Sequence, residues 1–167
     1  MKTIDLHGTI IDVGLGDQKI ARSPDVLVTY GLGSCVGICL YDGVHKIAGL
    51  AHIVLPHCKK SGAVTQPYRY ADTALPLLLQ KMIDAGASTQ YLTAKIAGGS
   101  RMYATAENAM EHNVGQENVQ IVKELLIHFH IPIIADDTRK DCARTLFFSA
   151  KDGSVQVKTD TMGEWVL

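Results

Sequence analysis

The sequence lacks the features that mark several common classes of protein. Lys and Arg number 16 against 17 for Asp and Glu, and the net charge of -1 argues against a nucleic-acid-binding surface, which normally needs an excess of positive charge. No hydrophobic run approaches the roughly 18 apolar residues that cross a membrane. Acids and a histidine in the opening stretch MKTIDLHGTIIDVG interrupt the apolar core that a signal peptide requires. We therefore expect a cytoplasmic protein with no nucleic-acid partner and no membrane insertion.

Internal repeats and low-complexity segments are also absent. A chain of 167 residues that is 47% hydrophobic and 20% charged is typical of one globular domain with a substantial core, so we expect residues 1–167 to form a single domain. Structural disulfides are not expected in a reducing cytoplasm. A lone cysteine is most often a small buried hydrophobe, and that interpretation applies first to all four cysteines of the chain, which are Cys35, Cys39, Cys58 and Cys142.

Hydrophobic patterns predict strands interleaved with two helices, a mixed α/β or α+β class. Apolar residues at helical spacing predict helices over residues 72–85, with Asp72 as N-cap, and 116–129. The strands are predicted, in chain order, over residues 26–29, 36–41, 46–55, 91–97, 131–135, 145–150 and 155–158. We interpret the first three as a β-meander with an Asp42-Gly43 hairpin. Their near-continuous apolar character is typical of strands covered on both faces.

The main candidate site is the stretch GLGSC, from Gly31 to Cys35. Its glycines permit a tight turn, and successive N–H groups in such a turn can converge on an anion. Gly33 and Ser34 would thus support an oxyanion, and a thiolate at Cys35 would be stabilised with a lowered pKa. A glycine-rich hairpin with a buried cysteine explains the same residues, because Gly-x-Gly is common. The local sequence leaves both interpretations open.

A nucleophilic cysteine needs a base, and His52 is the leading candidate. It interrupts the apolar stretch GLAHIVLP, where a histidine is costly to bury without a partner. Pairing around the predicted hairpin would bring it near Cys35. Thr29 ends the preceding strand, and its hydroxyl could orient the imidazole. A satisfied core histidine and an ordinary strand threonine remain open alternatives. No metal site is predicted, because His52, His57 and Cys58 lack a fourth ligand.

The sequence resembles a known family. The stretch VTYGLGSC, followed by GLAHIVLP, is similar to the chemoreceptor glutamine deamidases of the CheD family. The similarity continues in the same order through YRYADTALPLLLQKMIDAGA, KIAGGSRM and NVGQENVQIVKELL, and it covers residues 24–158. The resemblance implies Cys35, His52 and Thr29 as catalytic residues. It also implies a layered α/β/β fold with mixed sheets, similar to a bacterial toxin deamidase, and no metal or organic cofactor.

The resemblance also implies a reaction and its partners. Cys35 would attack a glutamine side chain in the cytoplasmic region of chemotaxis receptors, yielding glutamate and ammonia through a thioester. His52 would move the protons, Thr29 would fix the imidazole, and N–H groups around Ser34 would hold the oxyanion. Some members of the family also bind a CheC-type phosphatase, which is therefore a second expected partner.

One segment departs from the family pattern. Where the family usually carries Gly-Gly…Gly-Arg after the second helix, this chain has ADDTRKDCARTLFF. Arg139, Lys140 and Ala143 replace the glycines, and only Arg144 remains, as an expected substrate or partner contact. Because glycines with positive φ resist replacement, we expect a different loop path. This departure motivates an alternative, a non-catalytic or weakly catalytic adaptor that docks a receptor or a CheC-type phosphatase. A thiol hydrolase acting on another amide is a third interpretation.

Overall fold

The computed structural model of the protein describes residues 4–59, 64–101 and 113–167. Two α-helices, α1 (Ala71–Asp84) and α2 (Val114–His128), and two short 3-10 helices, η1 (Pro67–Arg69) and η2 (Thr89–Tyr91), occur in this part of the chain. Its strands are β1 (Ile10–Asp12), β2 (Gln18–Arg22), β3 (Val26–Leu32), β4 (Val36–Asp42), β5 (Ile47–Ile53), β6 (Leu92–Gly98), β7 (Ile133–Thr138), β8 (Arg144–Ser149), β9 (Val155–Thr159) and β10 (Gly163–Val166).

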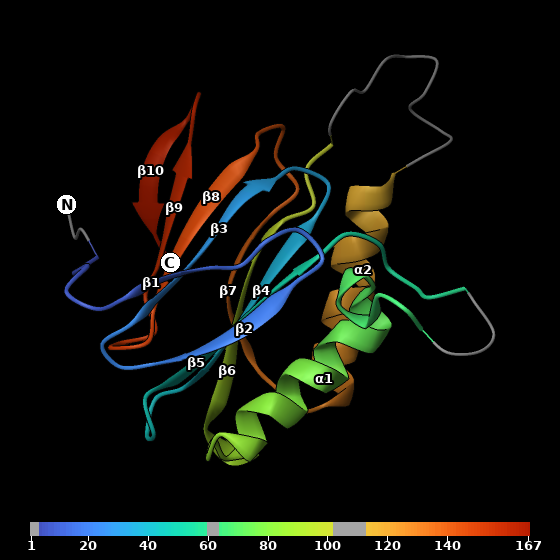
Figure 1. The fold of residues 1–167 in the computed structure, drawn as a ribbon. Coiled ribbons are helices and arrows are strands. Elements are labelled where there is room, and N and C mark those ends of the chain that lie inside the picture. Colours follow the sequence, from blue (N-terminus) through green and yellow to red (C-terminus); the bar gives the residue numbers. More distant parts are fainter. Residues whose placement is uncertain (1–3, 60–63, 102–112) are drawn as a thin grey trace.

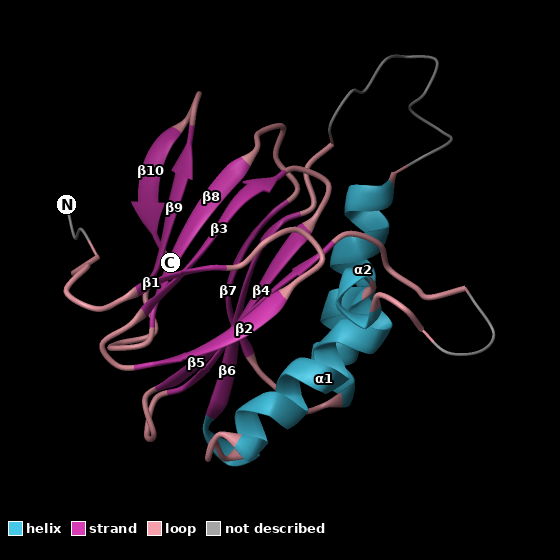
Figure 2. Cartoon of the chain, in the orientation of Figure 1, coloured by secondary structure: helices cyan, strands magenta, loops and turns pink. Residues whose placement is uncertain are grey.

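The strands form two mixed sheets. The inner sheet has the order β2-β5-β4-β6-β7, and the outer sheet has the order β1-β3-β8-β9-β10. Each contains one parallel pair, β6 with β7 and β1 with β3, among antiparallel neighbours. Both α-helices pack on one face of the inner sheet, and the outer sheet lies against its other face (Figures 1 and 2). The predicted layered α/β/β arrangement with mixed sheets is therefore confirmed.

The central strands of the inner sheet are buried on both faces, as their apolar sequences predicted. Every residue of β4 and β5 is buried. Side chains alternate between the faces of a strand, so β4 contributes Val36, Ile38 and Leu40 to the core beneath the helices. The intervening residues Cys35 and Cys39 belong to the core between the two sheets. The candidate nucleophile therefore faces the outer sheet.

The predicted β-meander is wrong in one important respect. β4 and β5 pair around the hairpin as expected, with Asp42 opposite Ile47, but β3 belongs to the outer sheet. Gly31, with φ of 69°, lies where the register of β3 shifts, and the turn at residues 33–35 then carries the chain from one sheet to the other. Thr29 thus belongs to the outer sheet, and Cys35 directly precedes β4, the central strand of the inner sheet.

Both helices begin earlier than the pattern predicted. α1 starts at Ala71 after Tyr70, and Asp72 lies in its first turn rather than at the cap, where its carboxylate accepts the backbone N–H of Cys58. α2 starts at Val114 because the Asn113 side chain accepts the Gln116 N–H, a standard N-cap. No helix in the described part of the chain combines the length and apolar composition needed to cross a membrane.

Candidate active site

The register of the inner sheet brings Cys35 and His52 to the same face. His52 on β5 lies directly opposite Gly37 on β4, and Cys35 precedes Gly37 by two residues. Residues two apart on a strand share a face, so Cys35 and His52 lie on the same face of the sheet. Gly37 has no side chain, so β4 places none between them. Cys35 is 8% exposed and His52 is 1% exposed. The sequence-based expectation that the two lie near each other thus agrees with the register.

Thr29 reaches the imidazole from the outer sheet. Its Oγ1 lies 2.8 Å from His52 Nδ1 and 2.7 Å from the carbonyl oxygen of Val13. A hydroxyl has one proton, and a carbonyl can only accept, so Thr29 donates to Val13. His52 Nδ1–H must then be the donor to Thr29. This fixes the tautomer of the neutral imidazole and leaves the lone pair on Nε2.

The Nε2 lone pair of His52 accepts no hydrogen bond from the described residues. Nε2 is buried and has no hydrogen-bond partner among the described residues. Burial lowers the pKa of His52 to about 4, because the interior disfavours the charged form. A neutral imidazole with an unpaired, buried acceptor carries a desolvation cost. Because Nε2 has no partner in the described part of the chain, it is available to accept a proton from a neighbouring group.

The Cys35 thiol is less acidic than the sequence suggested. The pKa of Cys35 is raised, because burial outweighs the opposing effects of the Arg69 charge and of the backbone N–H of Cys35 itself. The expected lowering of this pKa was wrong, since a turn between two stacked sheets is dry. With a neutral thiol and a neutral imidazole, the resting site holds no thiolate–imidazolium pair. Attack by Cys35 must transfer its proton at the same time.

Backbone hydrogen bonds from the residues that follow β6 hold the turn that carries Cys35. Gly99 N–H donates to Cys35 O and Ser100 N–H donates to Gly33 O, both at 2.8 Å. Gly98 has φ of 110°, and a Cβ there would lie 2.2 Å from Cys35 O, so glycine is required at this position. Within the described chain, the N–H groups of Ser34 and Cys35 donate to no backbone carbonyl. They remain free to hold an oxyanion, as the sequence suggested.

Asn118 on α2 is a site residue that the sequence analysis missed. It is fully buried, and its Nδ2 donates to both Ser34 O and Val54 O at 2.9 Å. The side chain thereby ties the nucleophile turn to the strand end that follows His52. A signal was available, because Asn118 shares one helical face with Val122 and Leu126 at four-residue spacing. A polar residue on such a face must find partners inside the protein.

Arg144 does not lie where a substrate could contact it directly. It is 1% exposed, its Nε lies 2.9 Å from Asp137 Oδ2, and its Nη1 lies 2.7 Å from Ser100 Oγ. The guanidinium thus supports Ser100, which in turn binds Gly33. The preceding loop contains Arg139 and Lys140, which replace two glycines of the family pattern. Their φ values are 73° and 23°, in the left-handed region that glycine adopts most readily, and the expected change of loop path stays a prediction.

The geometry of these groups defines a class of site. A buried thiol, a neutral imidazole with a free acceptor and a turn with free N–H groups can support thiol-dependent acyl transfer. Among the described residues, no group of three or more His, Cys, Asp or Glu side chains could hold a metal ion. The remaining question is which amide or ester such a site would act on.

Comparison with known proteins identifies the family. The model of the family described as "CheD chemotactic sensory transduction" matches residues 54–159. A Clostridium novyi protein named "Probable chemoreceptor glutamine deamidase CheD" is 44% identical over 92% of this chain and 94% of its own length. A protein of the same name from Caldanaerobacter subterraneus subsp. tengcongensis is 42% identical over 92% of this chain and 95% of its own length. The chain belongs to the CheD family of chemoreceptor glutamine deamidases.

A solved structure shows a weaker likeness. The crystal structure of the hypothetical protein YfiH from Bacillus licheniformis aligns with a TM-score of 0.46 and 15% sequence identity. The alignment covers 82% of this chain and 61% of the YfiH chain. At this level it adds nothing to the family assignment, which the sequence relatives establish.

Proposed function

We propose that this chain is a cysteine-dependent protein-glutamine deamidase that converts glutamine side chains of chemotaxis receptors to glutamate and ammonia. Membership of the CheD family supports the reaction and the substrate class. The observation that carries the mechanism is the hydrogen bond between Thr29 and His52 Nδ1 at 2.8 Å. It leaves Nε2 as a buried, unpartnered base on the strand face shared with Cys35.

The first half of the reaction forms a thioester. Cys35 Sγ attacks the carboxamide carbon while its proton moves to His52 Nε2. The N–H groups of Ser34 and Cys35 hold the oxyanion that develops on the amide oxygen. His52 then returns the proton to the departing nitrogen, the carbon–nitrogen bond breaks, and ammonia leaves. The side-chain acyl group that remains, a γ-glutamyl group, is thereby bound to Cys35 as a thioester, and His52 is neutral again.

The second half hydrolyses the thioester. His52 Nε2 takes a proton from water as the water oxygen attacks the acyl carbon. Collapse of the tetrahedral intermediate breaks the carbon–sulfur bond, and His52 returns its proton to Cys35 Sγ. Glutamate and the free thiol result. In both halves Thr29 accepts the Nδ1–H hydrogen bond, so it is a positioning residue that stabilises the imidazolium formed in each step.

Several further features of the proposal rest on the family resemblance. The substrate would be the cytoplasmic region of a methyl-accepting chemotaxis receptor, so the protein would act in the cytoplasm. A CheC-type phosphatase is proposed as a second partner. Residues 1–167 are proposed to work as one deamidase domain. Arg144, expected to contact substrate, is proposed instead to act through Ser100 on the position of Gly33.

The test is deamidation of a receptor cytoplasmic fragment, followed by ammonia release and peptide mass spectrometry. The native chain should release ammonia, and Cys35→Ser should not. Cys39→Ser is the matched control, because Cys39 belongs to the same core between the sheets but lies four residues along β4. Equal activity of Cys35→Ser and the native chain would exclude the thiol mechanism.

A further inference from the structure

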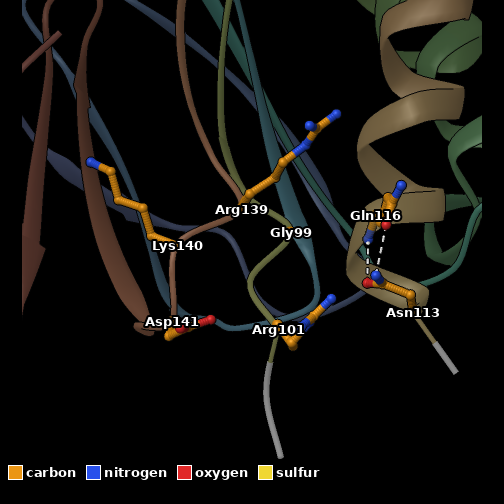
Figure 3. A pocket seen from close by; sticks show the side chains of 7 residues that line it. All are labelled: Gly99, Arg101, Asn113, Gln116, Arg139, Lys140 and Asp141. Atoms are coloured by element: carbon orange, nitrogen blue, oxygen red, sulfur yellow. Dashed lines mark hydrogen bonds between the residues drawn. The ribbon is translucent and has the colours of Figure 1, made fainter. Parts of the chain in front are cut away.

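A basic cavity lies beside the nucleophile turn and has no role in the mechanism above. It has a volume of about 340 Å³ and is lined by Gly99, Arg101, Asn113, Gln116, Arg139, Lys140 and Asp141. We call it the basic cleft. Figure 3 shows Arg101 and Arg139 on the side that faces α2, whereas Lys140 extends the other way. The first residues of α2 close the remaining side, so the positive end of the helix dipole also points to the cleft.

Two of the three cations of the basic cleft have no carboxylate partner in the described chain. Lys140 Nζ lies 2.6 Å from Asp137 Oδ1 and stacks over the Trp165 ring, so its charge is already engaged. Arg101 and Arg139 are exposed and form no ion pair with the described residues. Asp141 lines the cleft as its single acid. The basic cleft therefore carries an excess of positive charge. The guanidinium groups of its two arginines are planar and can each bind a carboxylate through two hydrogen bonds.

The backbone of the basic cleft is under strain. Arg139 and Lys140 adopt positive φ values, which glycine tolerates and which long side chains seldom adopt. Such strain persists when the surrounding structure holds it, and it gathers at binding sites. Here the loop is fixed by the hydrogen bond from Arg139 N–H to Gly98 O. From this backbone the Arg139 side chain extends towards α2 (Figure 3).

A backbone hydrogen bond joins the basic cleft to the turn that carries Cys35. Gly99, which lines the cleft, donates its N–H to Cys35 O at 2.8 Å. The adjacent Ser100 N–H donates to Gly33 O. Residues that flank a glutamine bound at Cys35 would therefore lie within reach of the basic cleft. Cationic side chains at this distance can select what flanks the glutamine.

We propose that the basic cleft binds acidic side chains that flank the target glutamine on the substrate polypeptide. The inference rests on the proposed deamidase function and narrows its substrate class to glutamines in acidic surroundings. Arg101 and Arg139 would each pair with a carboxylate about one helical turn from the glutamine. The contact fixes the substrate's position without taking part in the chemistry, so it acts on KM rather than on kcat.

The test compares two peptides with two protein variants. Both peptides carry the same glutamine, and one has glutamates one helical turn to either side where the other has serines. The variant Arg101→Gln/Arg139→Gln removes the two charges that have no carboxylate partner among the described residues. Arg22→Gln/Lys151→Gln is the charge-matched control, because Arg22 pairs opposite Ile47 at the hairpin end of the sheet and Lys151 follows the distant end of β8.

We expect the cleft variant to raise KM for the glutamate peptide by about three- to tenfold, as two partly exposed ion pairs would. Its kcat, and its KM for the serine peptide, should match those of the native chain. The control variant should behave as the native chain with both peptides. Equal KM values for the two peptides on the native chain, or a KM rise that the control variant reproduces, would overturn the inference and leave the deamidase function intact.

A binding measurement separates this inference from the proposed chemistry. Fluorescence anisotropy of the labelled peptides is recorded with Cys35→Ser protein, which needs no turnover. Tighter binding of the glutamate peptide that is lost with Arg101→Gln/Arg139→Gln supports the basic cleft even where no deamidation occurs. Equal binding of both peptides contradicts it. Absence of deamidation by the native chain contradicts only the proposed function.

Discussion

Acidification should destabilise the fold through His52 by an amount that the structure sets. The pKa of His52 is lowered from 6.5 to about 4 by burial, while the unfolded chain keeps the ordinary value. Between these two values the unfolded state binds the proton and the folded state does not, so stability falls as the pH falls. A difference of this size corresponds to about 3 kcal/mol of unfolding free energy. The loss should begin below about pH 6.5 and be complete near pH 4.

Urea unfolding followed by circular dichroism measures this loss directly. The native chain and His52→Gln, which has no titrating ring, are compared from neutral pH to about pH 4.5. The native chain should lose roughly 2 kcal/mol more than the variant over that range. NMR of the native imidazole gives a second readout, and it should show the neutral Nδ1–H tautomer throughout. Parallel pH dependence of the two proteins, or an imidazole that titrates near its ordinary pKa, would refute the reasoning.

Three further predictions concern the neighbours of the imidazole. Thr29→Val removes the acceptor of Nδ1–H and should lower kcat by about tenfold or more, whereas Thr29→Ser should keep most of the activity; equal rates for the two variants would contradict the tautomer assignment. Because burial raises the pKa of Cys35 and only the thiolate reacts, alkylation by iodoacetamide should be slow near neutral pH and should accelerate steadily from neutral to alkaline pH. A rate that is constant over this range would indicate a thiolate already formed. Asn118→Ala leaves two carbonyls without a donor and should cost about 1–3 kcal/mol in urea unfolding and lower kcat with KM unchanged; a loss confined to KM would contradict a positioning role.

The sequence predicted the long apolar elements and missed the short edge strands. β4 and β5 were recognisable because their sequences are almost entirely apolar, and all seven residues of each are buried. β1 and β10 have three and four residues and lie at the edges of the outer sheet. Such strands carry too few residues for a period to show, although β10 pairs with its chain neighbour β9. The change of sheet between β3 and β4 was also missed, because the sequence of a turn does not show which strand the next one pairs with.

The sequence indicated residues that the structure brings together, and it did not predict their electrostatics. Cys35, His52 and Thr29 could be chosen because each is unusual in its local setting, and pairing around the hairpin predicted the first two as neighbours. The raised pKa of Cys35 follows from the outer sheet lying over the turn, which no local pattern reveals. The roles of Asn118 and Arg144 likewise depend on hydrogen bonds between elements far apart in the sequence.

One measurement tests the central claim most directly, and it is hydrolysis of a receptor glutamine in isotopically labelled water. A receptor cytoplasmic fragment is incubated with the native chain in ordinary water and in water enriched in oxygen-18, and its peptides are weighed. Hydrolysis of a Cys35 thioester predicts a gain of about one dalton per converted glutamine in ordinary water and about three in labelled water. Cys35→Ser should give neither. Conversion that persists in Cys35→Ser, or no conversion by the native chain, would contradict the account.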